Sequence, residues 1–260
     1  FLDEHITFDY CIGVSAGSAN VASYLAGQRG RNLRFYVDHL HEPGYMGVKN
    51  LLRTGQFFGL QYIYQTLTNS DGADPIDYPA IMANPAEFEL VATDAATGKP
   101  VYFTKDDMKQ DDYRAIMASC ALPVMCRPIS FKDQTYFDGG LSDSVPIMRA
   151  FAKGCDRVVV ILSKPRSFVK QPEGFRHIYR HALRKYPQTI AALDNRHLMY
   201  RQNIADVKKQ ESAGKALVFA PSKELKMSTY ARDEKLEQEL YDLGISDFDA
   251  RLNELHTFLS

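Results

Sequence analysis

Gly13-Val14-Ser15-Ala16-Gly17 directly follows a short apolar run at residues 8–12, and this junction decides the fold. A Gly-x-Ser-x-Gly motif behind such a run predicts a nucleophile elbow, in which a strand turns sharply into a helix and exposes the serine at the tip. Because glycine has no Cβ, we expect Gly13 and Gly17 to let the strand and the helix approach closely. The helix after Ser15 would point the positive end of its dipole at negative charge that develops beside the serine.

The composition is that of an ordinary globular protein and excludes several classes of function. The 260 residues are 45% hydrophobic and 24% charged, which is sufficient for a substantial core. A net charge of −1 gives no support for a nucleic-acid partner. No apolar stretch approaches the roughly 18 residues of a membrane span, so we expect any membrane contact to be peripheral. Four cysteines without a Cys-x-x-Cys pair predict reduced thiols in a cytoplasmic protein, although a start at Phe1 rather than Met leaves a signal peptide open.

Apolar runs alternate with amphipathic segments along the chain, which is typical of an α/β fold with a mainly parallel central sheet. Strands are expected at residues 8–12, 88–93, 101–103, 129–137, 157–162 and 216–221. The β-branched run at 157–162 is expected to be a buried parallel strand. Helices are expected at residues 18–28, 107–119, 146–153, 175–210 with a break at Pro187, and 233–259 with a break at Gly244. We expect a single domain over 1–260, with 173–260 as a more helical C-terminal extension packed on it.

A serine hydroxyl becomes nucleophilic when a base removes its proton, and histidine is the usual base. His177, His181 and His197 follow Ser15 and Asp138 in the order of an α/β-hydrolase triad. All three lie among arginines in the long helical segment, where a solvated helix face is expected, whereas a triad base belongs on a loop. His177 and His181 also have the spacing of two metal ligands. With neither a His-Glu-x-x-His motif nor a third ligand, no metal is expected there.

Asp138-Gly139-Gly140 offers the serine a different partner. The motif directly follows residues 135–137, at the carboxyl end of an expected strand, where α/β folds place their sites. Its two glycines leave space for substrate or for another segment. An aspartate with its ordinary pKa near 3.9 is a weak base, but burial would raise that pKa and make a Ser-Asp dyad workable. On its own, an aspartate before two glycines is more often an ordinary turn.

Gly13-Val14-Ser15-Ala16-Gly17-Ser18 and Asp138-Gly139-Gly140 together resemble the motifs of the patatin-like phospholipase family. Three further blocks match in consistent order over about residues 5–165, closest to bacterial members: Ala92-Thr93-Asp94 with Thr97-Gly98, Ala118-Ser119-Cys120-Ala121-Leu122-Pro123, and Val158 to Leu162. The resemblance implies a three-layer α/β/α sandwich that hydrolyses lipid acyl esters. It implies that Ser15 is the nucleophile and Asp138 the base, with no histidine and no cofactor.

One part of the family pattern is absent from the sequence. The family carries a glycine-rich loop, Asp/Glu-Gly-Gly-Gly-x-Arg-Gly, upstream of the elbow, and its amides form the oxyanion hole. No such segment precedes Gly13. We therefore expect the N-terminal strand and this loop to lie outside the sequence shown. Ala16, directly after the nucleophile, is expected to offer one amide donor, with Gly13, Gly17, Gly139 and Gly140 as supporting residues of the two motifs.

Other residues bear on the substrate side of the site. Phe57, Phe58 and Tyr62 would line an acyl-chain pocket or contact a membrane, and a helix buried on one face is the alternative. Ser119 is expected to make a structural hydrogen bond rather than to act as a second nucleophile. A basic stripe would attract anionic headgroups, with a solvated helix face as the alternative. The stripe consists of Arg176, Arg180, Arg184 and Lys185.

The sequence thus predicts a serine acyl hydrolase of the phospholipase A, lysophospholipase or esterase type that acts through an acyl-enzyme. Its expected partner is a lipid or acyl-ester substrate, with peripheral membrane contact and no nucleic acid. Two alternatives stay open. One is a Ser-His-Asp esterase that uses a histidine from residues 177–197. The other is a non-catalytic lipid-binding or regulatory protein with the same fold.

Overall fold

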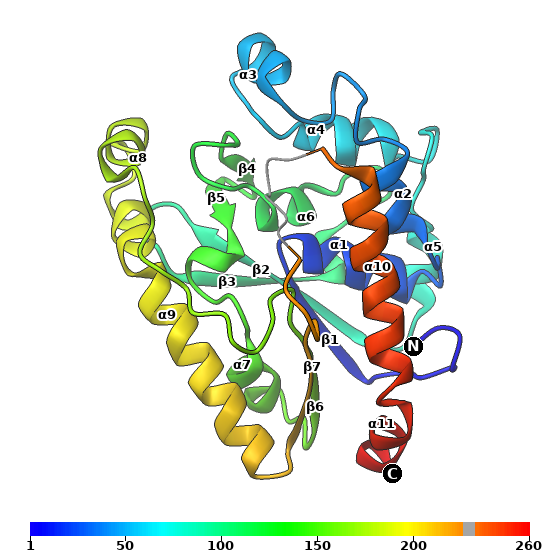
Figure 1. The fold of residues 1–260 in the computed structure, drawn as a ribbon. Helices are drawn as coiled ribbons and strands as arrows, with labels where there is room; N and C mark the ends of the chain where they lie inside the picture. Colours follow the sequence, from blue (N-terminus) through cyan, green and yellow to red (C-terminus); the bar gives the residue numbers. More distant parts are fainter. Residues whose placement is uncertain (226–231) are drawn as a thin grey trace.

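The computed structural model describes residues 1–225 and 232–260 and has a mixed α/β fold (Figure 1). The strands are β1 Tyr10–Val14, β2 Glu87–Asp94, β3 Pro100–Thr104, β4 Ile129–Phe131, β5 Gln134–Asp138, β6 Val158–Ile161 and β7 Ala216–Phe219. The helices are α1 Ala16–Leu25, α2 Arg31–Val37, α3 Val48–Thr54, α4 Leu60–Tyr62, α5 Tyr78–Ala83, α6 Arg114–Ser119, α7 Ile147–Ala152, α8 Arg176–Ala182, α9 Pro187–Ser212, α10 Glu234–Asp249 and α11 Leu252–Leu259. Single helical turns lie at Ile63–Leu67, Lys105–Asp107 and Gly139–Leu141.

The larger sheet is mixed rather than mainly parallel, so the sequence-based prediction of its strand directions is wrong. Among the described strands of this sheet, β1 and β2 alone pair in parallel, whereas β3 and β5 pair with β2, and β4 pairs with β5, in antiparallel fashion. Short connections explain two of the antiparallel pairs, β2–β3 and β4–β5, because a tight turn can join only antiparallel strands. Lys132 and Asp133, with φ of 48° and 59°, form such a turn, and it splits the single strand expected at 129–137 into β4 and β5.

The second sheet contains β6 and β7, which pair in parallel. The predicted strand at 157–162 therefore exists and is parallel, but it is not fully buried, since Ile161 is 67% exposed. Its β-branched residues reflect strand propensity more than burial on both faces.

Helix boundaries agree with the sequence in one place and differ in two. The expected break at Pro187 is confirmed, because α9 begins at this proline, which lacks the N–H that a first helical residue leaves unpaired. The helix expected from residue 107 begins only at Arg114. No break occurs at Gly244, because α10 runs through this exposed position and ends at Asp249; a single exposed glycine costs a helix only about 1 kcal/mol.

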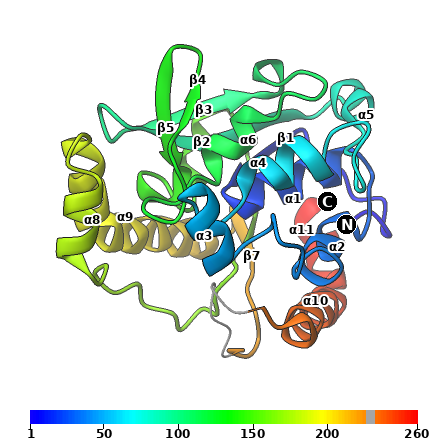
Figure 2. The same ribbon diagram turned by 90° about the horizontal axis from the view of Figure 1, so that it is seen from above.

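Helices pack against both sheets. α1 and α6 pack against β2, α9 lies along the second sheet, and α10 stands on the opposite side next to α2 (Figures 1 and 2). The two ends of the chain meet in one hydrophobic cluster, in which Phe1 and Phe8 pack with Phe219 and Leu255. Over residues 1–225 and 232–260, no helix combines the length and the apolar character needed to cross a membrane.

Candidate active site

Ser15 occupies a sharp turn between β1 and α1. Its backbone has φ of 54° and ψ of −127°, a strained conformation for a residue with a Cβ. Gly13 is required by space, because a Cβ there would lie 2.5 Å from Cα of Ser18. Gly17 is different, since a Cβ at this position would meet nothing within 4 Å. The predicted close approach therefore depends on Gly13 alone, and the same role for Gly17 is wrong.

The sheet register brings Ser15 and Asp138 to one point. β3 pairs with Glu89–Thr93 of β2, so β1 and β5, which share some of those β2 positions, must both use the other edge of β2. On that edge β1 ends at Val14 opposite Val91, while β5 approaches from the other direction and ends at Asp138 opposite Ala92. The two strands thus run toward each other and stop at adjacent positions of β2.

A short hydrogen bond joins the two side chains. Oγ of Ser15 donates to Oδ2 of Asp138 at 2.6 Å, and the aspartate is only 1% exposed. The other carboxylate oxygen, Oδ1, accepts from the backbone N–H of Gly140 at 2.7 Å. Burial raises the pKa of the Asp138 carboxyl above its ordinary value, and Ser15, Arg196 and Gly140 offset part of that rise. A buried carboxylate with a raised pKa is a better base at neutral pH.

Ser119, the last residue of α6, forms hydrogen bonds with the elbow. Its Oγ accepts the backbone N–H of Ser15 at 2.9 Å and lies 2.8 Å from Oγ of Ser18. Ser119 and Ser18 are both fully buried. The expected structural hydrogen bond is therefore present, and it holds the strained backbone of the nucleophile itself.

The backbone around Asp138 is also fixed by neighbours. Asp138 N–H donates to the carbonyl of Ala121 at 2.9 Å, and Oγ1 of Thr93 donates to the Asp138 carbonyl at 2.8 Å. A Cβ at Gly139 would lie 2.1 Å from the carbonyl oxygen of Val91. Only glycine therefore fits at this position, where the chain leaves β5. Thr93 was not singled out from the sequence as a site residue, although it lies in one of the matching blocks.

The long helix α9 contributes contacts that the sequence did not reveal. Nε of Arg196 donates to the carbonyl of Gly140 at 2.8 Å, and its Nη1 lies 3.1 Å from Oε1 of Glu173. Further along α9, Oδ1 of Asn203 accepts the backbone N–H groups of Ser144 and Val145, each at 3.1 Å. The loop after Asp138 is therefore held by a segment more than fifty residues away. The sequence offered no signal for Arg196, which is one of two arginines in α9.

The histidines do not join this site. His177 and His181 are exposed on α8, and His197 lies on α9. Among the residues that the structure describes, no hydrogen bond connects a histidine with Ser15 or Asp138. The geometry therefore gives no support to a Ser-His-Asp triad.

The aromatic residues suggested for a substrate pocket build part of the core beneath α3. The rings of Phe57 and Phe58 lie 5.1 Å apart and pack against a buried cluster that includes Phe35 and Met46. Tyr62 donates its hydroxyl to Glu42 at 2.5 Å. Phe57 and Phe58 lie between α3 and α4 rather than in the expected one-sided helix, and Tyr62 ends α4. A role of the three in binding an acyl chain stays a prediction.

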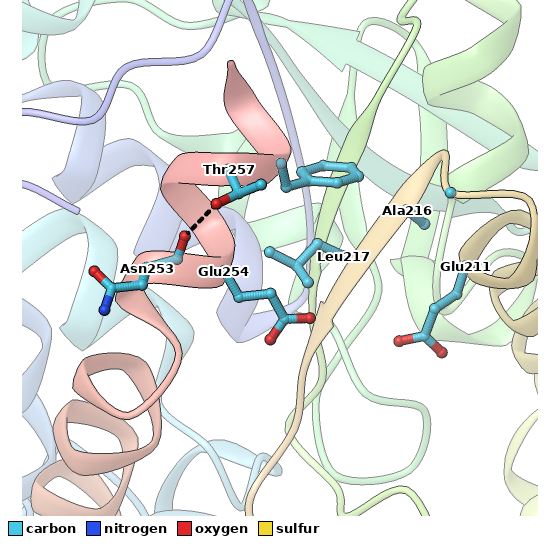
Figure 3. A pocket seen from close by; sticks show the side chains of 8 residues that line it. Glu211, Ala216, Leu217, Asn253, Glu254 and Thr257 are labelled. Carbon is cyan, nitrogen blue, oxygen red and sulfur yellow. Dashed lines mark hydrogen bonds between the residues drawn. The ribbon is translucent and has the colours of Figure 1, made fainter.

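A separate hollow of about 550 Å³ lies between β7 and α11, outside the dyad (Figure 3). Its lining residues are Glu211, Gly214, Ala216, Leu217, Asn253, Glu254, Thr257 and Phe258. The two carboxylates already have partners, because Glu211 pairs with Arg166 and Glu254 with Arg251. The hollow therefore presents neither an unpaired acid nor a nucleophile positioned by a base.

Two family models match the chain. One, described as patatin-like phospholipase, matches residues 2–151, and the other, described as a domain of unknown function (DUF6363), matches residues 186–260. A protein of Escherichia coli K12, named "Uncharacterized protein YjjU", is 24% identical over 174 residues, which cover 66% of this chain and 48% of that protein. The chain thus spans about half the length of this relative. Ser15, Asp138 and Ser119 lie in the first matched segment, and Arg196 and Asn203 lie in the second.

Proposed function

This chain belongs to the patatin-like phospholipase family, a family of lipid acyl hydrolases, and we propose that it hydrolyses lipid acyl esters with a Ser15–Asp138 dyad. The observation that carries the proposal is the 2.6 Å hydrogen bond from the half-buried serine of a strained elbow to a buried carboxylate. A turn aspartate without a catalytic role would have no need to be buried against a serine hydroxyl, because burial of an ionised carboxylate is costly.

In the proposed reaction, Asp138 accepts the Ser15 proton while Oγ attacks the ester carbonyl. The tetrahedral intermediate collapses to an acyl-enzyme, and the proton passes from Asp138 to the departing alcohol. Asp138 then takes a proton from water, whose oxygen attacks the acyl carbon. The fatty acid leaves as the proton returns to Ser15. The raised pKa of Asp138 supports both transfers, since the carboxylate holds the proton more firmly than an exposed aspartate would.

We place one oxyanion donor at the first turn of α1. The N–H of Ser15 is already used by Ser119, whereas the N–H groups of Ala16 and Gly17 have no acceptor inside the helix. The Ala16 N–H directly follows the nucleophile and lies at the positive end of α1. This amide is therefore our candidate donor to the oxyanion.

The finer features of the fold and the substrate belong to the same proposal. We propose a three-layer α/β/α arrangement and a single functional domain over 1–260, with 173–260 as its extension. The contact between Arg196 and Gly140 supports this, because the extension reaches the loop beside the dyad. We also propose that the acyl chain is bound near Phe57, Phe58 and Tyr62, and that the substrate is presented at a membrane surface.

A fluorophosphonate probe and a short-chain nitrophenyl ester test the dyad in the full-length protein. We expect Ser15→Ala to abolish labelling and to reduce kcat/KM about 10⁴–10⁶-fold. Asp138→Asn should reduce both, while Ser163→Ala, at an exposed serine, should change neither. His177→Ala, His181→Ala and His197→Ala should retain activity. Full turnover in either dyad variant would overturn the proposal, and a wild-type protein without turnover or labelling would favour a non-catalytic lipid-binding role.

A further inference from the structure

Two protruding segments expose large apolar side chains at the same end of the molecule. On α3, Leu52 is 82% exposed, with Val48 and Leu51 also in solvent, and at the start of α8 Phe175 is 84% exposed, with Ile178 nearby. Figure 1 shows α3 and α8 standing out from the body at this end, and Figure 2 looks down on it. Exposed apolar side chains gathered on projecting elements indicate an interaction surface.

The exposed residue Phe175 has a strained backbone conformation. It precedes α8 with φ of 52° and ψ of 40°, the left-handed conformation that bulky residues rarely adopt. Its neighbour Tyr179 is buried in the cluster under α8, so the helix itself is anchored. The strained residue therefore holds an aromatic ring in solvent, on a helix that is fixed by other contacts.

The charged residues within these two segments are all cationic. Residues 48–54 and 174–185 contain six Lys and Arg and no Asp or Glu, although the whole chain has 31 cationic against 32 acidic residues. Asp194 of α9 pairs with Arg176 and Arg180. The other four, Lys49, Arg53, Arg184 and Lys185, form no ion pair with any residue in the described ranges, and all are exposed. The surface is therefore complementary to an anionic partner.

The two segments lie on either side of the loop that borders the dyad. Met125 accepts the backbone N–H of Phe57, just beyond α3, and Val124 packs against the cluster beneath α8. The same loop starts at Ala121, whose carbonyl accepts the N–H of Asp138. An extended partner that contacts both segments would therefore cover the approach to Ser15.

We propose that α3 and residues 174–185 dock this protein on a lipid bilayer that contains anionic phospholipid. Leu52 and Phe175 enter the boundary between headgroups and acyl chains, and the cationic side chains lie at the level of the phosphates. Apolar side chains beside lysines and arginines are the combination that binds such interfaces. The inference rests on the proposed lipid hydrolysis, because docking at this end presents bilayer lipid to Ser15.

Flotation with vesicles tests the docking surface directly. The full-length protein is mixed with phosphatidylcholine vesicles, with or without 30% phosphatidylglycerol, at low salt and at 0.5 M salt. We expect binding to the anionic vesicles at low salt, and a decrease at high salt because screening weakens the contacts with phosphates. The double variant Leu52→Ser with Phe175→Ser should bind about tenfold less well or worse.

Matched variants elsewhere serve as controls. Leu198→Ser with Met148→Ser removes two other exposed apolar side chains and should leave binding unchanged. Lys49→Glu with Arg53→Glu should reduce binding to anionic vesicles, whereas Lys208→Glu with Lys209→Glu, on exposed α9 positions toward the opposite end of the molecule, should not. Circular dichroism and hydrolysis of a soluble nitrophenyl ester verify that each variant is folded.

Three results would overturn the docking surface. Wild-type protein that binds neither kind of vesicle would do so, as would undiminished binding by the Leu52–Phe175 double variant. The third is a dimer in lipid-free solution that this double variant dissociates, since the occupant would then be a second copy of the chain. A wild-type protein that does not hydrolyse the soluble ester would instead contradict the proposed function. Vesicle binding is measured independently of hydrolysis, so the two failures are distinguishable.

Discussion

Oγ of Ser15 lies 2.6 Å from Oδ2 of Asp138, although 123 positions separate the two residues in the chain. They meet because β1 and β5 run toward each other along one edge of β2 and end opposite Val91 and Ala92. The dyad therefore does not require the aligned carboxyl ends of a parallel sheet. It depends on where two opposed strands stop, and so on the residues that hold their ends.

Replacement of Asp138 by asparagine should remove activity and increase stability. Burial raises the pKa of Asp138, so the folded protein holds this proton more tightly than the unfolded chain. The stability that this gives is complete below the ordinary aspartate pKa near 3.9 and is lost as pH rises through the raised value of the folded state. An asparagine side chain cannot ionise, and the Asp138→Asn variant should therefore have a higher Tm at pH 7.

Thermal unfolding at two pH values checks this expectation. Each kcal/mol gained should raise Tm by about 2–4 °C in a chain of this size, and the gain should shrink toward pH 4. An Asp138→Asn protein with lower Tm at pH 7 than the wild type would contradict the assignment of a costly buried charge.

Arg196 should act as a positioning residue that favours the ionised form of Asp138. In the part of the chain that the structure describes, the thiols of Cys120 and Cys126 also interact with the carboxylate, and burial raises the pKa of each to about 12, so both stay neutral. Arg196 is therefore the charged side chain that lowers the Asp138 pKa, while Glu173 pairs with Arg196 itself. Its removal should shift the acidic limb of the kcat/KM profile to higher pH.

We expect Arg196→Leu to lose several-fold more activity at pH 6 than at pH 9. Arg196→Lys should restore part of the acidic limb, since it keeps the charge without the planar donor group. Arg201→Leu, a matched change on α9, should behave as the wild type because Arg201, within residues 1–225 and 232–260, donates hydrogen bonds only to the carbonyl of Lys170. An equal loss of activity at both pH values would show that Arg196 has only a structural role.

Ser119→Ala should impair the nucleophile without removing any catalytic group. The change leaves the N–H of Ser15 without its acceptor, and an unsatisfied buried donor costs about 1–3 kcal/mol. We expect a fall in kcat with little change in KM. Ser18→Ala removes only the second contact of Ser119 and should be milder. Equal kinetics of the two variants would argue against a role for Ser119 in holding the elbow.

The two glycines of the elbow should respond in opposite ways. A Cβ at Gly13 would overlap the backbone of Ser18, so Gly13→Ala should cost about 1–3 kcal/mol or more. A Cβ at Gly17 meets only open space, and Gly17→Ala in the first turn of α1 should be neutral or stabilising by about 0.5–1 kcal/mol. Urea unfolding of both variants measures the difference, and similar losses would contradict the geometry of the turn.

The sequence reveals those parts of the site that depend on local motifs. The elbow could be predicted because a sharp turn before a helix needs glycine at position 13. Asp138 could be predicted as a site residue because two glycines follow it. The directions of the strands could not be predicted from the sequence in this way. Residues 129–137 are predicted as one strand because Lys132-Asp133 lacks the glycine that usually marks a two-residue turn.

The Ser15–Asp138 pair was expected from the family motifs, but the other contacts over long distances in the chain could not be predicted. Arg196 reaches Gly140 because α9 lies across the loop after Asp138, and nothing in the sequence of α9 distinguishes this arginine from Arg201. Ser119 was correctly expected to make a structural hydrogen bond, but its partner, the N–H of Ser15, depends on how α6 packs beneath the elbow. Such contacts follow from tertiary packing rather than from spacing.

The most direct measurement of the central claim is the mass of the protein during turnover. Full-length protein is mixed with nitrophenyl butyrate, quenched in acid within the first turnovers, and mapped by peptide mass spectrometry. We predict a butyryl group on the peptide that contains Ser15, absent from Ser15→Ala and strongly reduced in Asp138→Asn. Ester hydrolysis that proceeds without acylation of Ser15, or acylation that is undiminished in Asp138→Asn, would contradict the account.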